Sequence, residues 1–223
     1  SKGENIHSAK VNANRSTEEI GPCDLVIVAV KTTANSELPA LIAPLLGEKT
    51  TILTLQNGLG NEELLARHFG AERILGGLCF ICLNRTAPGV IDLQDNGRLA
   101  LGDFSGFPRP RLHDLAWEFK RCGVVCTVVA DLALEHWRKL VWNIPFNGLA
   151  VVAGGLDPAQ ILDDGGLRQL AVELMDETSA MAHGRGRKRP TRDRRRGVQG
   201  ERGGHGGWRR SERKRENKKE VDR

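Results

Sequence analysis

The chain has 223 residues, enough for one large or two small domains, and its 39% hydrophobic and 27% charged residues are ordinary for a soluble globular protein. No stretch approaches roughly 18 uninterrupted apolar residues, so we predict no transmembrane helix and no membrane partner. The net charge of +5 is unevenly spread: residues 183–223 hold 17 Lys and Arg against 6 Asp and Glu, whereas residues 1–182 hold 16 against 22. A mildly acidic body therefore precedes a strongly basic tail.

Five cysteines, an odd number, are scattered through apolar segments of a chain whose start shows no signal-peptide pattern. We therefore predict reduced thiols in the core of a cytoplasmic protein. Cys79 and Cys82 have the C-x-x-C spacing of a redox or zinc half-site, but side chains three apart in an extended run point to opposite faces. No second pair of ligands follows, so we predict no metal site. The five are Cys23, Cys79, Cys82, Cys122 and Cys126.

The first strongly patterned segment is the continuous, largely β-branched run at residues 24–30. It predicts a strand buried on both faces, of the kind found in parallel sheets. A helical stretch interrupted by two prolines follows, and Gly47 would end it. Residues 50–55 predict a second strand, and after a turn at residues 56–60 comes an amphipathic helix at residues 61–69. This alternation of strands and helices is typical of a doubly wound α/β sheet.

Two polar side chains stand just beyond the ends of these predicted strands. In doubly wound sheets, ligands bind at the carboxyl ends of the strands, so Lys31 and Asn57 are expected at the same edge. Simpler explanations stay open for both. Asn57 and Gly58 can form a turn because both residue types tolerate a positive φ, and Lys31 can be an ordinary surface charge.

The next part of the chain predicts short strands and one helix. Pro88–Gly89 and Asn96–Gly97 suggest hairpin turns, and hence an antiparallel addition to the parallel sheet. The predicted strands are residues 74–82, 90–93, 98–101 and 124–129, and the predicted helix is residues 110–122, with Leu112, Leu115, Ala116 and Phe119 on its apolar side.

Strand-rich sequence gives way to helix near Ala130 and Asp131, and we place a domain boundary there. In the helix that follows, Lys139, Asn143 and Asn147 recur every four residues and share one stripe within roughly 80° of arc. We call these three residues the lysine–asparagine stripe. It is either a solvated helix face or the wall of a ligand cleft.

Two further features concern this helical part. Pro145 cannot donate to the carbonyl of Val141, so we expect a kink between Asn143 and Asn147. Residues 157–182 predict another helical region. Its apolar face should be core and consists of Leu167, Leu170, Ala171, Leu174 and Met175.

The stripe motif Lys139-Leu140-x-x-Asn143-x-x-x-Asn147, taken with Leu55-Gln56-Asn57-Gly58-Leu59-Gly60, resembles the ketopantoate reductase family of NADPH-dependent 2-dehydropantoate 2-reductases. The resemblance covers about residues 21–182, and the motifs occur in the right order. It implies a partial Rossmann-like NADP-binding domain over residues 1–130 and a partial all-helical substrate and catalytic domain over residues 131–182.

The resemblance also implies roles. A keto carbon that accepts hydride needs a proton donor for its oxygen, and the family likeness gives this role to Lys139, with Asn143 and Asn147 binding the substrate. Asn57 and Lys31 would contact NADPH, Asn57 at its nicotinamide end. The implied activity belongs to pantothenate biosynthesis. A reductase of another 2-keto acid and a non-catalytic remnant of the fold remain alternatives.

The sequence departs from the family pattern in two places. It has no G-x-G-x-x-G turn, whose amides would hold the cofactor pyrophosphate. We therefore expect the first βαβ unit to be missing, weak binding of the phosphate end of NADPH, and exposed edges that favour aggregation or a homodimer. The family also takes a serine and a glutamate from later helices, and we match neither in this chain.

Residues 183–223 are rich in Gly, Arg and Lys and cannot pack a core, so we predict a disordered tail. Three interpretations stay open. The tail could bind nucleic acid through its basic residues, with Trp208 stacking on a base. It could be a solvated linker, or it could result from a shift in reading frame.

Overall fold

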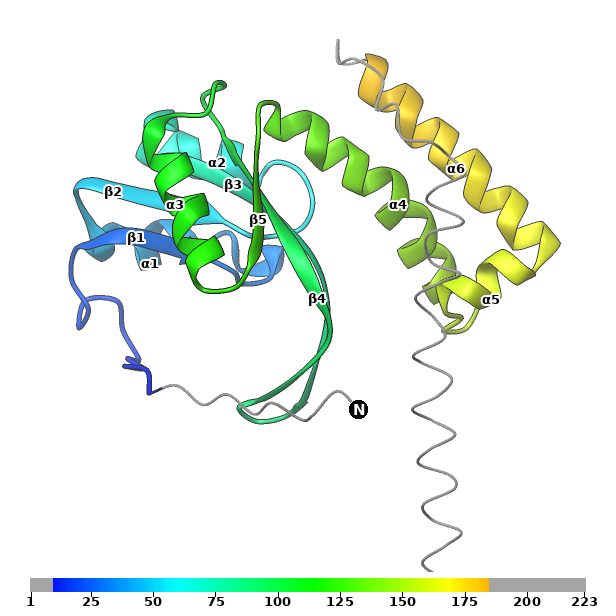
Figure 1. Ribbon diagram of the computed structural model, residues 1–223, viewed down its shortest axis with the longest axis horizontal. Coiled ribbons are helices and arrows are strands. Elements are labelled where there is room, and N and C mark those ends of the chain that lie inside the picture. Colours follow the sequence, from blue (N-terminus) through cyan, green and yellow to red (C-terminus); the bar gives the residue numbers. More distant parts are fainter. Residues whose placement is uncertain (1–9, 185–223) are drawn as a thin grey trace, which may run out of the picture. The chain divides into compact units, whose positions relative to one another are not determined.

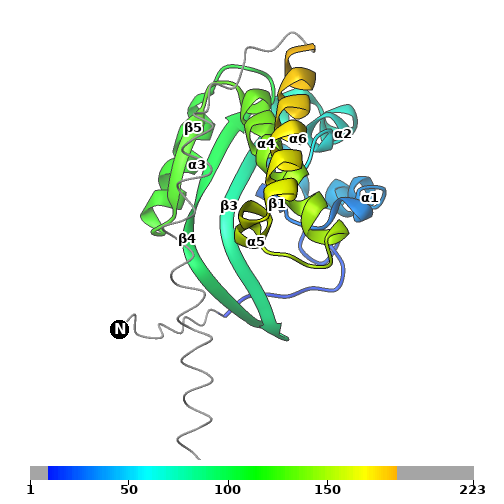
Figure 2. The same ribbon diagram turned by 90° about the vertical axis from the view of Figure 1, so that its right-hand side faces the viewer.

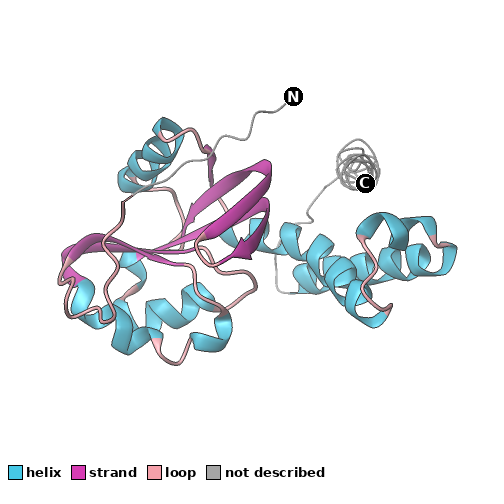
Figure 3. Cartoon of the chain, turned by 90° about the horizontal axis from the view of Figure 1, so that it is seen from below, coloured by secondary structure: helices cyan, strands magenta, loops and turns pink. Residues whose placement is uncertain are grey.

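The structure, a computed structural model, describes residues 10–184. The chain divides into two compact units, the first ending at Leu132 and the second beginning at Ala133 (Figure 1). Figure 3 shows that the strands belong to the first unit and that the second is helical. Apart from its first two residues, which end a helix, the predicted tail at residues 183–223 lies outside the described residues.

The first unit is built on a five-stranded sheet with the order β1-β2-β3-β4-β5. The first three strands are parallel, β4 is antiparallel to β3, and β5 is parallel to β4. The elements in chain order are β1 (Cys23–Val28), η1 (Thr32–Ala34), α1 (Leu38–Ile42), η2 (Ala43–Leu45), β2 (Leu46–Thr54), α2 (Asn61–Phe69), η3 (Ala71–Arg73), β3 (Ile74–Ala87), β4 (Val90–Asp103), α3 (Pro110–Arg121) and β5 (Val125–Val129). The predicted α/β class, with its antiparallel addition, is confirmed.

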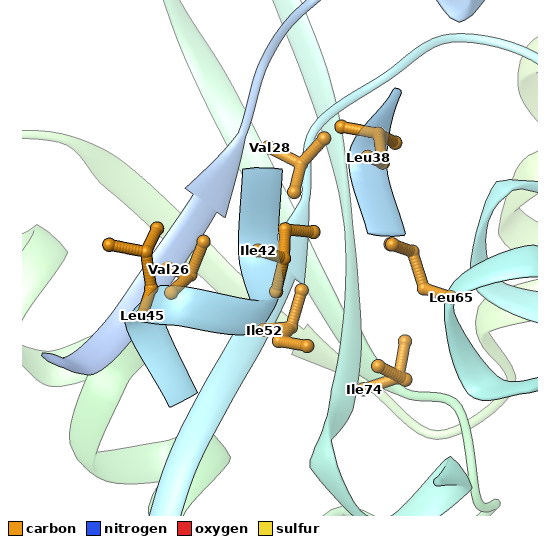
Figure 4. Close-up of a cluster of buried hydrophobic side chains, with 8 residues drawn as sticks. All are labelled: Val26, Val28, Leu38, Ile42, Leu45, Ile52, Leu65 and Ile74. Atoms are coloured by element: carbon orange, nitrogen blue, oxygen red, sulfur yellow. The ribbon is translucent and has the colours of Figure 1, made fainter. Parts of the chain in front are cut away.

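Helices cover both faces of the sheet, and consecutive residues of β2 point into two different cores. Ile52 enters the core under α1 and α2, and Leu53 enters the core under α3; both are fully buried. Burying a side chain of this size stabilises the fold by about 1.5–3 kcal/mol. Figure 4 shows the first core, which consists of Val26, Val28, Leu38, Ile42, Leu45, Ile52, Leu65 and Ile74.

The prediction that the first strand is buried on both faces was wrong. Val26 and Val28 are buried, but Ile27 between them is 46% exposed. The physical reason is that β1 is the edge strand, and the α3 core takes in Leu25 in part without reaching Ile27.

The prolines after β1 start short helices where we expected them to interrupt one. Pro39 lies in the first turn of α1 and Pro44 in the first turn of η2, where a missing N–H leaves no hydrogen bond unmade. Gly47 was expected to end a helix but lies inside β2. The predicted helices of α2 and α3 are confirmed, including the apolar side of α3.

Strands β3 and β4 form one long, curved hairpin (Figure 2). Its turn at Pro88–Gly89 is as predicted, but the second predicted turn at Asn96–Gly97 was wrong, because those residues continue β4. A Cβ atom at Gly97 would lie 2.1 Å from the carbonyl oxygen of Phe80. The glycine therefore permits close strand approach rather than a turn.

Up to residue 184, where the described part of the chain ends, the second unit contains three helices. They are α4 (Leu132–Val152), whose first residue belongs to the first unit, α5 (Pro158–Asp163) and α6 (Gly165–Gly184). Asp157 caps α5 in a capping box with Gln160. The core of this unit contains Phe146, Leu149, Ile161, Leu162 and Ala171, with Leu167, Leu174 and Met175 packed against it. Leu170, which we predicted to be core, is 41% exposed.

All five cysteines, each within the described residues, are free thiols. The predicted core location holds only for Cys126, since Cys82 and Cys122 are exposed and the other two are half-buried. Desolvation raises the pKa of the Cys126 thiol. Among the helices of residues 10–184, none has both the length and the hydrophobicity that crossing a bilayer requires.

Candidate functional site at the carboxyl ends of the parallel strands

Lys31 and Asn57 both lie just beyond the carboxyl ends of β1 and β2, at the same end of the sheet; we call this end of the sheet the edge. Val28 and Thr54, the last residues of β1 and β2, are paired in the parallel register. Lys31 comes three positions after Val28, and Asn57 comes three positions after Thr54. The amide of Leu55 also donates to the carbonyl of Val28 at 2.8 Å. Both polar residues are exposed at this edge. Their roles in binding stay predictions.

A glycine-containing turn connects Asn57 to α2. Gly58 and Gly60 have φ angles of +99° and +90°, values that favour glycine, whereas Asn57 keeps a negative φ. A Cβ atom at either glycine would meet no atom within 4 Å, so backbone conformation rather than crowding requires them. Gly58 thus has the positive φ that the turn interpretation expected, Asn57 does not, and the Asn57 side chain is exposed.

Beneath this edge, three carboxamides form a chain of hydrogen bonds, which we call the amide relay (Gln56, Asn35 and Asn61). Of these, the sequence analysis named only Gln56, as a member of the family motif. Gln56 Nε2 donates to the Asn35 Oδ1 at 2.8 Å, and Asn35 Nδ2 donates to the Asn61 Oδ1 at 3.0 Å. The relay ends on backbone carbonyls, with Gln56 Nε2 donating to Val30 O at 3.0 Å and Asn61 Nδ2 donating to Asn57 O at 3.2 Å. The only signal in the sequence was three amides near strand-end turns.

The first turn of α2, which follows this loop, carries two acidic residues. Helix N-termini attract anions, but the first turn of α2 already carries Glu62 and Glu63, and Glu62 is buried. Glu63 is exposed there, whereas the buried Glu62 carboxylate lies against Gly76 of β3.

The lysine–asparagine stripe lies on α4, in the second unit. Lys139 and Asn143 are half-buried and Asn147 is exposed. The helix continues through Pro145, so all three residues belong to one helix. Trp142 and Phe146, each one position before a stripe asparagine, stack with ring centroids 4.0 Å apart and pack in the core of this unit.

The stripe therefore runs along the border between the core side and the exposed side of α4. Its residues are close to one another by helical spacing, and so are Lys31 and Asn57 by strand register. The two groups belong to different units.

A second polar cluster, the ion-pair cluster (Asp103, Ser105 and Arg109), lies where β4 ends. Asp103 is buried and receives hydrogen bonds from Arg109 Nε at 2.6 Å and from Ser105 Oγ at 2.8 Å. Burial opposes ionisation of this carboxyl, but the bonds from Arg109 and Ser105 outweigh it and hold the pKa of Asp103 below its usual value. Because β4 runs antiparallel to β3, this cluster faces the end of the sheet where β3 begins.

Comparison with known proteins gives consistent matches. Residues 1–106 match the family model described as ketopantoate reductase PanE/ApbA, and residues 131–210 match the model of its C-terminal part. The 2-dehydropantoate 2-reductase of a Nostoc species is 38% identical over 186 residues, covering 81% of this chain and 58% of that protein.

Solved structures are also similar. The crystal structure of 2-dehydropantoate 2-reductase from Geobacter metallireducens has a TM-score of 0.72 and 49% identity, covering 75% of this chain and 55% of that chain. D-mandelate dehydrogenase in complex with NADH and anilino(oxo)acetate shares the fold, with a TM-score of 0.69 and 19% identity, covering 76% of this chain and 54% of that chain. The chain thus spans little more than half the length of these relatives.

Proposed function

We propose that this chain, which belongs to the ketopantoate reductase family, contributes the nicotinamide-binding edge and the catalytic lysine of an NADPH-dependent 2-dehydropantoate 2-reductase. The observation that carries the proposal is the position of Lys31 and Asn57, which each follow the last residue of a strand by three positions in two strands whose last residues are paired. This arrangement puts two of the proposed ligand-binding residues at the edge where doubly wound sheets bind cofactors.

The proposed reaction converts the 2-keto group of 2-dehydropantoate to the alcohol of pantoate. When bound, NADPH supplies the hydride for the keto carbon. The Lys139 ammonium donates a proton to the keto oxygen and attracts the substrate carboxylate. Asn143 orients the substrate next to that ammonium, and Asn147 binds it one turn further along α4.

The first unit is proposed to hold the cofactor. The Asn57 carboxamide pairs with the carboxamide of the nicotinamide, and Lys31 supplies a positive charge at the same edge. The acidic residues in the first turn of α2 disfavour strong phosphate contacts at this end of the sheet. We therefore expect this chain to bind the nicotinamide end of the cofactor better than its phosphate end.

The choice between NADPH and NADH, the pathway and the location depend on the same proposal. Pantothenate biosynthesis and a cytoplasmic location follow if the substrate is 2-dehydropantoate. The reduction rate with each cofactor, and with competing 2-keto acids, would identify the substrate and the cofactor. A higher rate with another 2-keto acid would keep the reaction class and replace the substrate.

Turnover by the full chain tests the proposal through one substitution. Lys139→Ala removes the proton donor, so we expect a loss of about 10²–10⁴-fold in the reduction rate. Lys49→Ala, which removes an exposed lysine of β2, should leave the rate unchanged. Undiminished turnover of Lys139→Ala would remove Lys139 from the mechanism.

A further inference from the structure

The amide relay joins the two loops that carry the proposed cofactor contacts. At one end, Gln56 donates to the carbonyl of Val30, the residue before Lys31. At the other end, Asn61 donates to the carbonyl of Asn57 itself. The peptide bond between Gln56 and Asn57 closes the relay into a ring. A movement of either loop must therefore break or stretch a hydrogen bond of the ring.

The direction of every hydrogen bond in the relay is fixed. The carbonyls of Val30 and Asn57 can only accept, so Gln56 and Asn61 must turn their NH₂ groups toward them. Asn35, between the two amides, must then accept from Gln56 and donate to Asn61, as it does. Reversing any one amide would set two donors or two acceptors against each other. The relay therefore has a single satisfied arrangement.

Burial makes this arrangement stiff. Gln56 is 6% exposed and Asn61 is 2% exposed, and Asn35 between them is half-buried, so water has little access to the two end amides. The remaining oxygen of Gln56 is also satisfied, because Thr54 Oγ1 donates to Gln56 Oε1 at 3.2 Å. A fully satisfied buried network of polar groups rigidifies the elements that it connects.

We propose that Gln56, Asn35 and Asn61 are positioning residues that hold the Lys31 and Asn57 loops at one separation and so set the affinity for the nicotinamide end of the cofactor. The inference rests on the proposed function, because it takes Lys31 and Asn57 as the cofactor contacts. The three amides act through these two residues and do not touch the cofactor.

A carboxylate in the relay tests this directly. Asn61→Asp keeps the shape of the side chain, but the ionised carboxylate cannot donate to the carbonyl of Asn57. A buried carboxyl has a raised pKa, and in its protonated form it can donate again. We expect the affinity for oxidised nicotinamide mononucleotide, measured by calorimetry, to fall about tenfold at pH ~8 and to recover at pH ~5.

Hydrogen exchange of the full chain gives a readout that does not need the cofactor. Relative to wild type at the same pH, Asn61→Asp should speed amide exchange both in residues 55–61 and in residues 29–36, because the relay couples the two segments. Ser36→Asp is the matched control, since it puts the same charge on an exposed position of the first loop. Gln56→Glu should reproduce the effect of Asn61→Asp and serves if that variant folds poorly.

The outcomes separate the inference from the proposed function. If the wild-type chain binds no nicotinamide mononucleotide, the proposed function fails. The part of the inference that concerns cofactor affinity then fails with it. Amide hydrogen exchange still decides whether the two loops are coupled. If wild type binds and Asn61→Asp binds equally well at both pH values, the inference alone fails. Faster exchange confined to residues 55–61 would likewise overturn the coupling.

Discussion

The two partly buried polar clusters of the first unit solve the same problem with different chemistry. Each ties a loop to the sheet, but the amide relay uses neutral groups and the ion-pair cluster uses Asp103 and Arg109. Neutral amides fix the direction of their hydrogen bonds without adding a formal charge beside the proposed cofactor contacts. An ion pair is stronger when intact and responds to pH. Lys31 and Asn57 thus lie at the end of the sheet that the amide relay supports, and the hydrogen bonds of this relay do not depend on protonation.

The largest expected effect comes from breaking the ion-pair cluster. Arg109→Met leaves the Asp103 carboxylate buried without its cation, and we expect a loss of about 2–3 kcal/mol in the free energy of unfolding. This is less than for a fully buried pair, because 34% of the Arg109 side chain is exposed. Urea denaturation measures it.

The matched control is Arg121→Met, which breaks the exposed pair with Glu118. Pairs of this kind contribute at most about 1 kcal/mol. Equal losses for the two variants would show that burial of Asp103 adds nothing.

The same cluster predicts a pH dependence. Because the pKa of Asp103 is lower in the folded chain than in the unfolded chain, its contribution is present above the usual aspartate pKa of about 3.9 and is lost as the pH falls through the folded value. As the pH is lowered from neutral into the acid range, the free energy of unfolding should fall more steeply for wild type than for Arg109→Met. Parallel curves would exclude Asp103 as the source.

Breaking the amide relay should have an intermediate effect with the opposite pH dependence. Asn61→Asp puts an ionised carboxylate against a carbonyl, and we expect a loss of about 1–2 kcal/mol in the free energy of unfolding near pH 8. The loss should shrink as the pH falls and the carboxyl is protonated, since its folded pKa is raised. Thermal unfolding at two pH values checks this, and a loss that grows in acid would contradict it.

The smallest effect is expected from Ser105→Ala in the ion-pair cluster. Arg109 still donates to both oxygens of Asp103, and Ser105 is exposed, so we expect a loss of about 0.5–1 kcal/mol in the free energy of unfolding. A loss as large as that of Arg109→Met would mean that the hydroxyl, rather than the guanidinium, holds the carboxylate.

Much of the fold could be predicted, because α2, α3 and the parallel start of the sheet follow from local hydrophobic periodicity. Features set by neighbours distant in sequence were missed. Ile27 is exposed because of the strand order, and Gly97 is needed because Phe80 lies close to it. The sequence alone reveals neither the strand order nor the proximity of Phe80 to Gly97.

The candidate site shows the same division. Strand-end positions predicted that Lys31 and Asn57 share an edge, since parallel strands align their carboxyl ends. The relay was missed because the hydrogen bonds among its three amides join residues 21 and 26 positions apart. Such bonds have no local pattern, and each amide alone looks like an ordinary turn or helix-start residue.

The most direct test of the account is to titrate the full chain with reduced nicotinamide mononucleotide and, in parallel, with NADPH, following nicotinamide fluorescence. We predict saturable binding of both within about tenfold of each other, since the proposed contacts are to the nicotinamide end. Asn57→Ala should weaken both equally. Binding of NADPH without any binding of the mononucleotide would contradict the account, because the phosphate end would then carry the affinity.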